Sequence, residues 1–589
     1  MSKMKKSLIT TAILVSLTLS ACGGSSGGSD DTDPVTPTPT PNTAPTDIAI
    51  DNSSVDENMA GAVVGKLSAT DAEGGAMTFT VDGDMFAIDG DELKLADGYA
   101  ANYEQATSMA VNVTVADADG ATFSKELTID VNDLLDTYKF NSKFVEGESS
   151  VSYTGQTARH ALIAELNHYI TNVLKGELED GTLTSRQDVI DVLDKFFRTT
   201  ELQYDNFPIT FTDAKEKFLT DISGSHKNLV GKLAGNDEKG QHKLWNDGDF
   251  EGWGEKGSTT PEGLVDIFFG QLADNAEAEL NGTIRQAVTG EDITDIYLNT
   301  NGTDLKQLIQ KFLLVGITYS QATDDYLGNE VVDAAGNDID GSKGLLTDNV
   351  AAVSGKSYST LEHQFDEGFG YFGATVDYLE YSDNEISGKI DADAGDREEY
   401  NGKHDTDEDG EISLKSEFLF GQSVNAGKRD RATAGNTNPT DFTKQVMEAF
   451  LAGRDIINAN AGMALTDDQM TELLTHRDAA VDAWERAIVA TVVHYINDTR
   501  SDLDKLGTAD FNYSDLAKHW SEMKGFALGI QFNPYSKISD ADYTRLHQLM
   551  QDAPVLDAAN VEAYKADLLA ARDIIQAAMS FDAENVANW

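Results

Sequence analysis

Two short stretches of the chain place a histidine and an acid three residues apart. His363 and Asp366 lie in LEHQFDEGFGYFG, and His519 and Glu522 lie in KHWSEMKGFALGIQFNP. Residues three apart share one face of a helix, so each pair would present an imidazole and a carboxylate together. Two such pairs could supply two nitrogen and two oxygen ligands, a set that suits iron, manganese or zinc. The alternative is that each pair is a buried ion pair with a structural role at a helix contact.

The acidic segment DTDEDGEISLKSE is a second candidate for metal binding. Its D-x-D-x-D-G pattern reproduces the start of an EF-hand calcium loop, and later polar residues match further ligand positions. The predicted calcium ligands are Asp405, Asp407, Asp409, Glu411, Ser413 and Glu417. The last position of such a loop is Ser416 here, so the bidentate acid would be Glu417, one residue later. A helix is expected to begin near Leu414, and an acidic solvated turn is the alternative.

The segment 47–136 has the alternation of a β-sandwich. AMTFTV, MAVNVTVAD and FSKELTIDV alternate apolar and polar residues, and clusters of glycine and aspartate separate them. Because apolar residues recur at every second position, one face of each strand should point toward a core. We therefore expect about seven short strands in an all-β sandwich. The segment resembles a cadherin repeat throughout. VDENMAGAVVGKLSATDAEGG matches the opening of the repeat, NYEQATSMAVNVTVADADG its middle and LTIDVND its close.

The resemblance to cadherins implies calcium ligands at both poles of the sandwich, because cadherins hold calcium between successive repeats. The acids at matching motif positions are Glu57, Asp71, Glu73, Glu104, Asp117, Asp130 and Asp133. Carboxylate oxygens suit calcium, which takes six to eight oxygen ligands. The motif is incomplete, since Asn102 replaces an aspartate and the asparagine that should follow DVND is missing. A calcium-free sandwich is therefore the alternative.

The remainder of the chain has the periodicity of helices. Ser185 precedes an apolar-periodic run, Pro261 stands at the first position of another, and Thr466 pairs with Gln469 before a long third run. These are N-terminal signals of helices. We expect 137–589 to form one large, mainly α domain built from two bundles and interrupted by acidic, glycine-rich loops.

The N-terminal segment has the pattern of a secretory signal. MSKMKKSLITTAILVSLTLSAC begins with lysines and continues with an apolar stretch too short to span a bilayer stably. LSAC resembles the lipobox of bacterial lipoproteins, which implies a signal peptide at 1–21 and lipidation of Cys22. Glycine follows the cysteine, which in that group implies the outer membrane. Residues 22–46 read as a tether rich in Gly, Ser, Pro and Thr. An ordinary signal peptide is the alternative.

The charge of the chain excludes one class of partner. It carries 44 basic and 101 acidic residues, a net charge of −57, which repels nucleic acid. This excess fits either a secreted surface adapted to salt or acids gathered to ligate metal. A single cysteine also excludes a disulfide within the chain.

The helical part resembles the imelysin-like group of bacterial lipoproteins. The segments YTGQTARHALIAEL, EHQFDEGFGYFG and HWSEMKGFALGIQFNP carry the resemblance. That group has two helical bundles and a G-x-H-x-x-E motif, and is associated with iron uptake. The motif carries over to His519 and Glu522, and loosely to His363 and Asp366. Both copies lack its glycine. The segments are more similar still to a related lipoprotein domain family of uncharacterised function.

No motif of an enzyme stands in a fitting context. The chain has no H-E-x-x-H and no P-loop or dinucleotide-binding glycine motif. We therefore expect a non-enzymatic binding protein that serves metal (iron) acquisition, with calcium as a further cofactor. The alternative is a calcium-dependent adhesion or surface-structural protein, and a metallopeptidase is less expected. The expected partners are the membrane, through the lipid anchor, and a metal-uptake or surface protein of the outer membrane.

Overall fold

The structure is a computed structural model that describes residues 41–103, 106–132, 134–237 and 241–589. The chain divides into two compact units, one ending at Leu134 and one spanning Leu135–Trp589. The division lies two residues before the boundary predicted from the change of periodicity. No helix in the described ranges is both long and apolar enough to cross a membrane.

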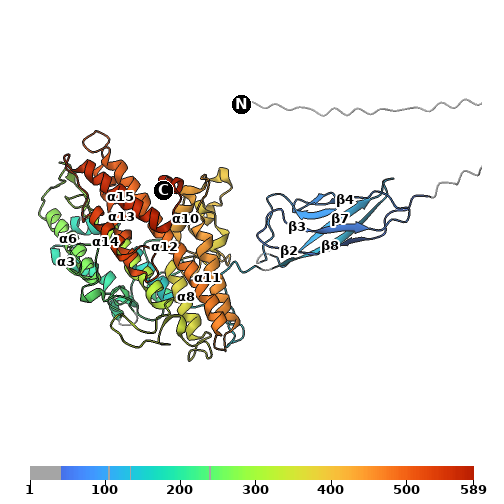
Figure 1. Cartoon of the computed structure of the whole chain (residues 1–589), viewed down its shortest axis with the longest axis horizontal. Helices are drawn as coiled ribbons and strands as arrows, with labels where there is room; N and C mark the ends of the chain where they lie inside the picture. Colours follow the sequence, from blue (N-terminus) through green and yellow to red (C-terminus); the bar gives the residue numbers. More distant parts are fainter. Residues whose placement is uncertain (1–40, 104–105, 133, 238–240) are drawn as a thin grey trace, which may run out of the picture. The chain divides into compact units, whose positions relative to one another are not determined.

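The first unit is a β-sandwich (Figure 1). Its described strands are β1 Ile48–Ile50, β2 Ser54–Asp56, β3 Val63–Ala69, β4 Thr78–Val81, β5 Phe86–Asp89, β6 Glu92–Leu95, β7 Ser108–Ala116 and β8 Thr122–Asn132. They form two four-stranded sheets in the orders β1-β3-β6-β5 and β2-β8-β7-β4. Every second residue of β7 from Met109 to Val115 is buried, as the alternation predicts. The core between the sheets includes Ile48, Leu93 and Ile129.

The second unit is mainly helical. Its α-helices are α1 Thr154–His168, α2 Leu174–Glu179, α3 Arg186–Phe197, α4 Glu201–Tyr204, α5 Leu219–Ile222, α6 Pro261–Leu280, α7 Leu305–Leu313, α8 Thr360–Phe372, α9 Asp383–Ser387, α10 Gly421–Thr433, α11 Phe442–Ala459, α12 Asp467–Leu503, α13 Tyr513–Ala527, α14 Asp540–Met550, α15 Val561–Met579 and α16 Ala583–Asn588. Two π-helical segments, η4 Leu314–Tyr319 and η5 Ala322–Tyr326, follow α7, and a short hairpin pairs β9 Arg285–Gln286 with β10 Asp292–Ile293. The predicted order of a β-sandwich followed by a mainly α domain is confirmed.

Helix starts follow the N-terminal signals predicted from the sequence. The side chain of Ser185 accepts a hydrogen bond at the start of α3, and Thr260 does the same before Pro261 at the start of α6. Thr466 and Gln469 form a reciprocal capping box at the start of α12. These side chains satisfy backbone N–H groups that have no partner within the helix, so a local sequence signal sets the start of each helix.

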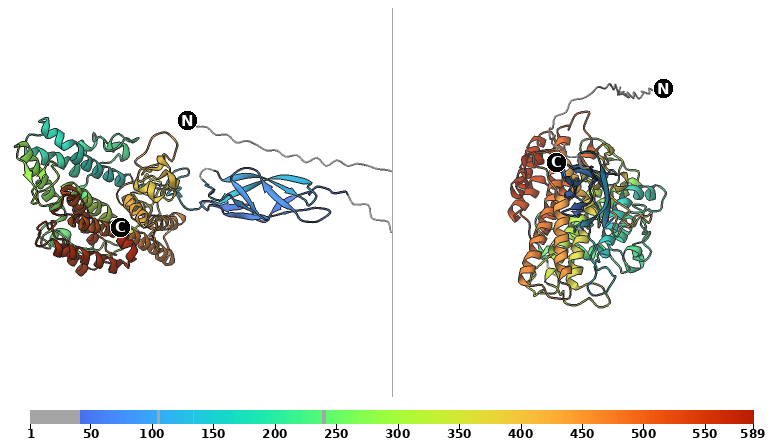
Figure 2. Two further views of the ribbon diagram at one scale, coloured as in Figure 1. Left: turned by 90° about the horizontal axis from the view of Figure 1, so that it is seen from above. Right: turned by 90° about the vertical axis from the view of Figure 1, so that its right-hand side faces the viewer.

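Helix α12 is the central element of the helical unit. It packs against α10, α11, α13 and α15 (Figure 1). In the left view of Figure 2 the cyan and green helices lie on one side of the unit and the orange and red helices on the other. One hydrophobic core runs through both groups from Tyr138 to Trp589, with Trp484 and Trp520 fully buried in it. The helices that carry the candidate ligands are therefore held by a shared core.

Candidate metal-binding sites

The predicted calcium loop brings three acids together. Asp405, Asp407 and Glu417 each offer a carboxylate oxygen, and these oxygens lie within 4.8 Å of one another. The N–H groups of Asp409 and Gly410 donate to the two carboxylate oxygens of Asp405 at 3.1 and 2.8 Å. This wraps the start of the loop around the acids, and Gly410 has the positive φ that a glycine adopts without strain. Among the residues that the structure describes, this is the one group of three ligand atoms at such spacing.

The other three predicted ligands of this loop point elsewhere. Asp409 forms an ion pair with Lys215, and the hydrogen bond from Lys215 lowers the pKa of Asp409. The hydroxyl of Ser413 donates to Glu216 at 3.0 Å, and Glu411 is exposed. The helix expected near Leu414 does not form: a turn occupies 414–416, and α10 begins at Gly421. Glu417 instead reaches the loop because it accepts from the N–H groups of Thr406 and Ser413.

The cadherin-like acids lie at two ends of the sandwich. Glu57 is buried and accepts from the N–H groups of Tyr103 and Leu134 at 2.6 and 2.7 Å, beside the end of β8 that carries Asp130. At the other end, Thr43 donates to Glu73 at 2.7 Å and Asn42 donates to Asp117 at 2.9 Å. No three of the described acids in this unit place ligand atoms within 4.8 Å of one another. Glu104, Asp133 and Cys22 lie outside the described residues.

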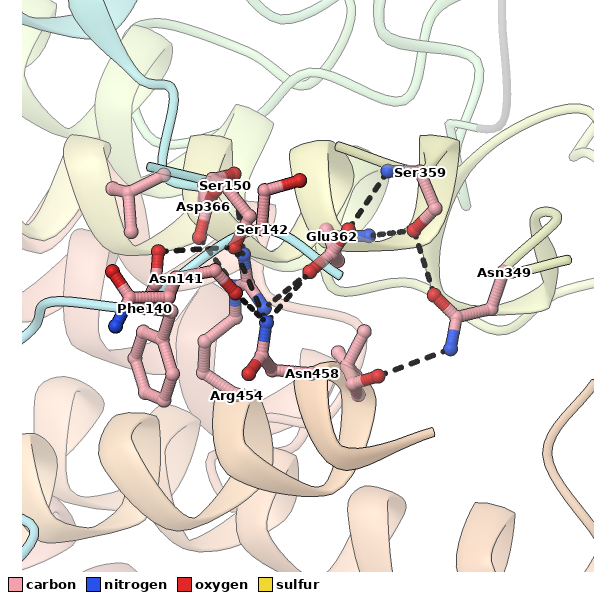
Figure 3. A network of polar contacts seen from close by, with 12 residues as sticks. Phe140, Asn141, Ser142, Ser150, Asn349, Ser359, Glu362, Asp366, Arg454 and Asn458 are labelled. Atoms are coloured by element: carbon pink, nitrogen blue, oxygen red, sulfur yellow. Dashed lines mark hydrogen bonds and ion pairs between the residues drawn. The ribbon is translucent and has the colours of Figure 1, made fainter. Parts of the chain in front are cut away.

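Asp366 belongs to a buried ion-pair network rather than to a histidine. Its side chain is fully buried on α8 and accepts from Arg454 Nε at 2.7 Å, from the Tyr138 hydroxyl at 3.0 Å and from the Ser152 N–H at 3.0 Å. Arg454 also donates to Glu362 at 3.1 Å (Figure 3). Burial raises the pKa of Asp366, while Arg454 acts in the opposite direction. The arginine therefore supplies the positive charge that these two carboxylates require in the interior.

His363 has partners other than Asp366. Its Nδ1 lies 2.9 Å from the carbonyl oxygen of Ser152, and its Nε2 lies 3.8 Å from Glu367. The partner acid is thus four residues along the helix, whereas the sequence suggested the acid three residues along. Both spacings bring side chains together on a helix, and the tertiary contacts of Asp366 decide between them.

The glycines of α8 allow close packing. A Cβ atom at Gly368 would lie 2.7 Å from the side chain of Leu327, and one at Gly370 would lie 2.6 Å from the side chain of Tyr153. Gly373 ends the helix with a φ of +84°. Close packing requires glycine at positions 368 and 370, because the side chains of Leu327 and Tyr153 occupy the space that a Cβ atom would fill.

His519 and Glu522 also have separate partners. His519 Nδ1 lies 2.8 Å from Asp502 Oδ2, and Glu522 lies 3.4 Å from Lys311 Nζ. The acids of the two stretches that suggested one shared metal site therefore have separate cationic partners, Arg454 for Asp366 and Lys311 for Glu522. No three of their ligand atoms lie within 4.8 Å of one another.

A histidine that the sequence analysis missed lies beside His519. On α12, His494 Nε2 is 3.4 Å from Asp498 Oδ2, and His519 Nε2 is 3.9 Å from the same oxygen. Two imidazoles therefore flank one carboxylate oxygen, although the three ligand atoms are more widely spaced than those of the calcium loop. The available signal was the spacing of His494, Asp498 and Asp502, which lie four residues apart on one helix face.

The electrostatic surroundings keep His494 neutral. Burial, with the positive charges of Arg429, His519 and Lys428, lowers the pKa of His494 to about 3. Burial acts against the protonated form of His519 as well, but its hydrogen bond with Asp502 and the charge of Asp498 raise its pKa overall. The surroundings thus shift the pKa values of the two imidazoles in opposite directions.

Residues 136–385 match the family model described as a domain of unknown function, DUF4856. The chain therefore contains a DUF4856 domain. The match includes α8 and ends before the calcium loop, α12 and His519.

Solved structures similar to this chain include two crystal forms of human protocadherin-24 EC1-2. Both are 25% identical to it, with a TM-score of 0.15. The alignments cover 17% and 19% of this chain and 49% and 58% of those chains, so the matched part spans about half the length of either structure. No curated protein matches the chain.

Proposed function

We propose that the protein is a lipid-anchored, non-enzymatic binding protein of the outer membrane that takes up a first-row transition metal, iron being the expected one. The observation that carries this proposal is the approach of His494 Nε2 and His519 Nε2 to Asp498 Oδ2, at 3.4 and 3.9 Å. Two imidazoles and one carboxylate suit iron, manganese or zinc and leave coordination positions open. The resemblance to the imelysin-like group supports iron among these metals.

The surroundings of the three side chains support this proposal. Asp502 accepts from His519 Nδ1, which would orient the ring so that Nε2 faces Asp498. The side chains of His494, Asp498 and His519 remain 27%, 36% and 21% exposed, so an ion from solvent can reach them. A small inward rotation of the imidazoles would complete the ligand set.

Alanine at His494 or His519 is expected to weaken cobalt binding. Each variant deletes one of three ligands, so the affinity for Co²⁺ should fall at least about tenfold, the loss that even a supporting residue of a metal site produces. Calorimetric titration of the full chain with CoCl₂ measures this. His476→Ala is the matched control, because His476 lies five turns earlier on the same helix. Equal affinities of all three variants and the wild type would refute the site.

Calcium is proposed as a structural ion at Asp405, Asp407 and Glu417. At calcium concentrations about a hundred times the dissociation constant, the ion should stabilise the fold by about 2.7 kcal/mol. Asp405→Asn should lose this gain, whereas Glu411→Gln, an exposed acid of the same loop, should keep it. Urea unfolding with calcium and with chelator measures the effect, and identical curves for the wild type would show that the loop is an acidic turn.

Calcium-dependent adhesion through the sandwich is the second candidate function. One observation favours it: Asp71 Oδ1 is buried and has no hydrogen-bond partner among the described residues. Glu73 and Asp117, beside the incoming segment at Asn42 and Thr43, would share an ion with it. Calcium-dependent clustering of particles coated with the protein would support this function.

A further inference from the structure

Arg429 is a buried cation without a hydrogen-bonding partner for two of its nitrogens. It lies on α10 and is 6% exposed, and its Nε and Nη1 atoms make no hydrogen bond within the described chain. The similarly buried Arg454 contacts two carboxylates. A guanidinium stays charged at neutral pH, so burying it without an anion is strongly unfavourable. The burial of the Arg429 charge therefore needs an explanation, whereas two carboxylates account for the burial of Arg454.

The position of Arg429 links it to the proposed metal site. Helix α10 packs against α12, which carries His494 and Asp498 (Figure 1). The indole N–H of Trp589 donates to the carbonyl oxygen of Arg429 at 3.1 Å, and the side-chain amide of Asn497, the residue before Asp498, donates to the carbonyl oxygen of Trp589 at 2.9 Å. Arg429 and its exposed neighbour Lys428 therefore lie beside the part of α12 that carries the proposed site. An anion that arrives from solvent would meet Lys428 before Arg429.

The carboxylates around Arg429 already have other partners. Glu522 faces Lys311 at 3.4 Å, and Asp502 contacts His519 and Lys505 at 2.8 and 3.0 Å. Asp430, the next residue in the chain, accepts from the N–H of Thr443 at 2.8 Å. The charges of Asp498 and Glu522 act on Arg429, but neither carboxylate forms a hydrogen bond with its Nε or Nη1 among the described residues.

The balance of charge at the metal site also favours the binding of an anion. Asp498 is the single carboxylate among the three proposed ligands, and the nearby Asp502 is already paired with Lys505, so a divalent ion bound there would keep a net positive charge. Arg429 and Lys428 would then repel it. An anion of two or more charges would remove this repulsion and occupy the open coordination positions.

We infer that the site takes its metal as an anionic complex, in which a carboxylate or phosphate group bridges the ion and Arg429. The inference rests on the proposed metal function and names the form in which the metal arrives. Arginine binds both oxyanions through paired N–H groups, so the geometry accepts either. The net charge of −57 opposes binding of the anion alone, so metal and anion should bind cooperatively.

Titration of the full chain with Co²⁺ alone, citrate alone, inorganic phosphate alone, and Co²⁺ with each anion tests this inference. We expect Co²⁺ affinity to rise on the order of tenfold with at least one anion, a typical coupling between two ligands. The anion that gives the larger rise identifies the carboxylate or phosphate class. Either anion alone should bind weakly.

Arg429→Gln should change how the affinity for Co²⁺ depends on the anion. It should lose the enhancement by the anion yet bind bare Co²⁺ more tightly than the wild type, because a repelling charge is gone. Arg431→Gln is the matched control on the same helix, since Arg431 is exposed and donates to Asn384. Lys428→Gln, at an exposed position that does not endanger folding, should lose part of the enhancement.

The possible failures are distinct. Co²⁺ binding that depends on His494 and His519 but is unaffected by citrate, phosphate or Arg429→Gln would overturn the anionic complex and leave the metal function intact. The absence of Co²⁺ binding with and without either anion would overturn the metal function, and the inference with it.

Discussion

Replacing Arg454 with alanine is expected to lower the free energy of unfolding by about 3–5 kcal/mol, because two buried carboxylates would lose their only cation within this network. Arg454 is fully buried and donates to Asp366 at 2.7 Å and to Glu362 at 3.1 Å. It also donates to the hydroxyl of Ser150, which ties the segment before α1 to α8 and α11 (Figure 3). Urea unfolding followed by circular dichroism measures the loss.

The pH dependence of this loss gives a second readout. Burial already raises the pKa of Asp366, and without Arg454 this pKa should rise further above its value in the unfolded chain. The destabilisation is then full near pH 7 and shrinks as the pH falls and the carboxyl group of Asp366 becomes neutral. Unfolding of the variant at pH 7 and pH 5 measures this difference.

An exposed ion pair provides the control. Arg186 contacts Asp274 at 2.5 Å, but the two side chains are 41% and 62% exposed, so Arg186→Ala should change stability by less than about 1 kcal/mol. Equal effects of the two substitutions would mean that the network of Arg454 does not stabilise the helical unit.

Replacing Gly370 with alanine is expected to destabilise the protein by about 1–3 kcal/mol, although alanine favours helices. The added Cβ would lie 2.6 Å from Tyr153 Cβ, closer than two carbon atoms approach. Tyr153 packs edge-on against Phe369 and lies at the start of α1, so it has little freedom to retreat.

Gly176 provides the matched control. It lies within α2 with no atom within 4 Å of an added Cβ, so Gly176→Ala should stabilise the protein by up to about 1 kcal/mol through helix propensity alone. Opposite signs for the two substitutions in urea unfolding would show that packing at Tyr153 requires the glycine. A stabilising effect of Gly370→Ala would contradict this explanation.

The sequence by itself predicted the elements whose causes are local. Strand β7 buries every second residue, since the period of a strand fixes which side chains face the core. Helices α3, α6 and α12 begin where Ser185, Thr260 and Thr466 can accept from the first turn. The acids of the loop at 405–417 follow the same logic in part, because a turn of a few residues brings Asp405 and Asp407 together.

Only the tertiary structure decided the partners of the candidate site residues. Asp366 pairs with Arg454, 88 residues away, and Glu522 faces Lys311 on a helix from a distant part of the chain. Helical spacing places His363 near both Asp366 and Glu367, but it says nothing of a cation on another helix that takes one of them. The approach of His494 and His519 to Asp498 likewise depends on how α12 packs against α13. The partner of a buried charge is the group of opposite charge that lies beside it in the folded core. Which group this is depends on contacts between residues far apart in the sequence.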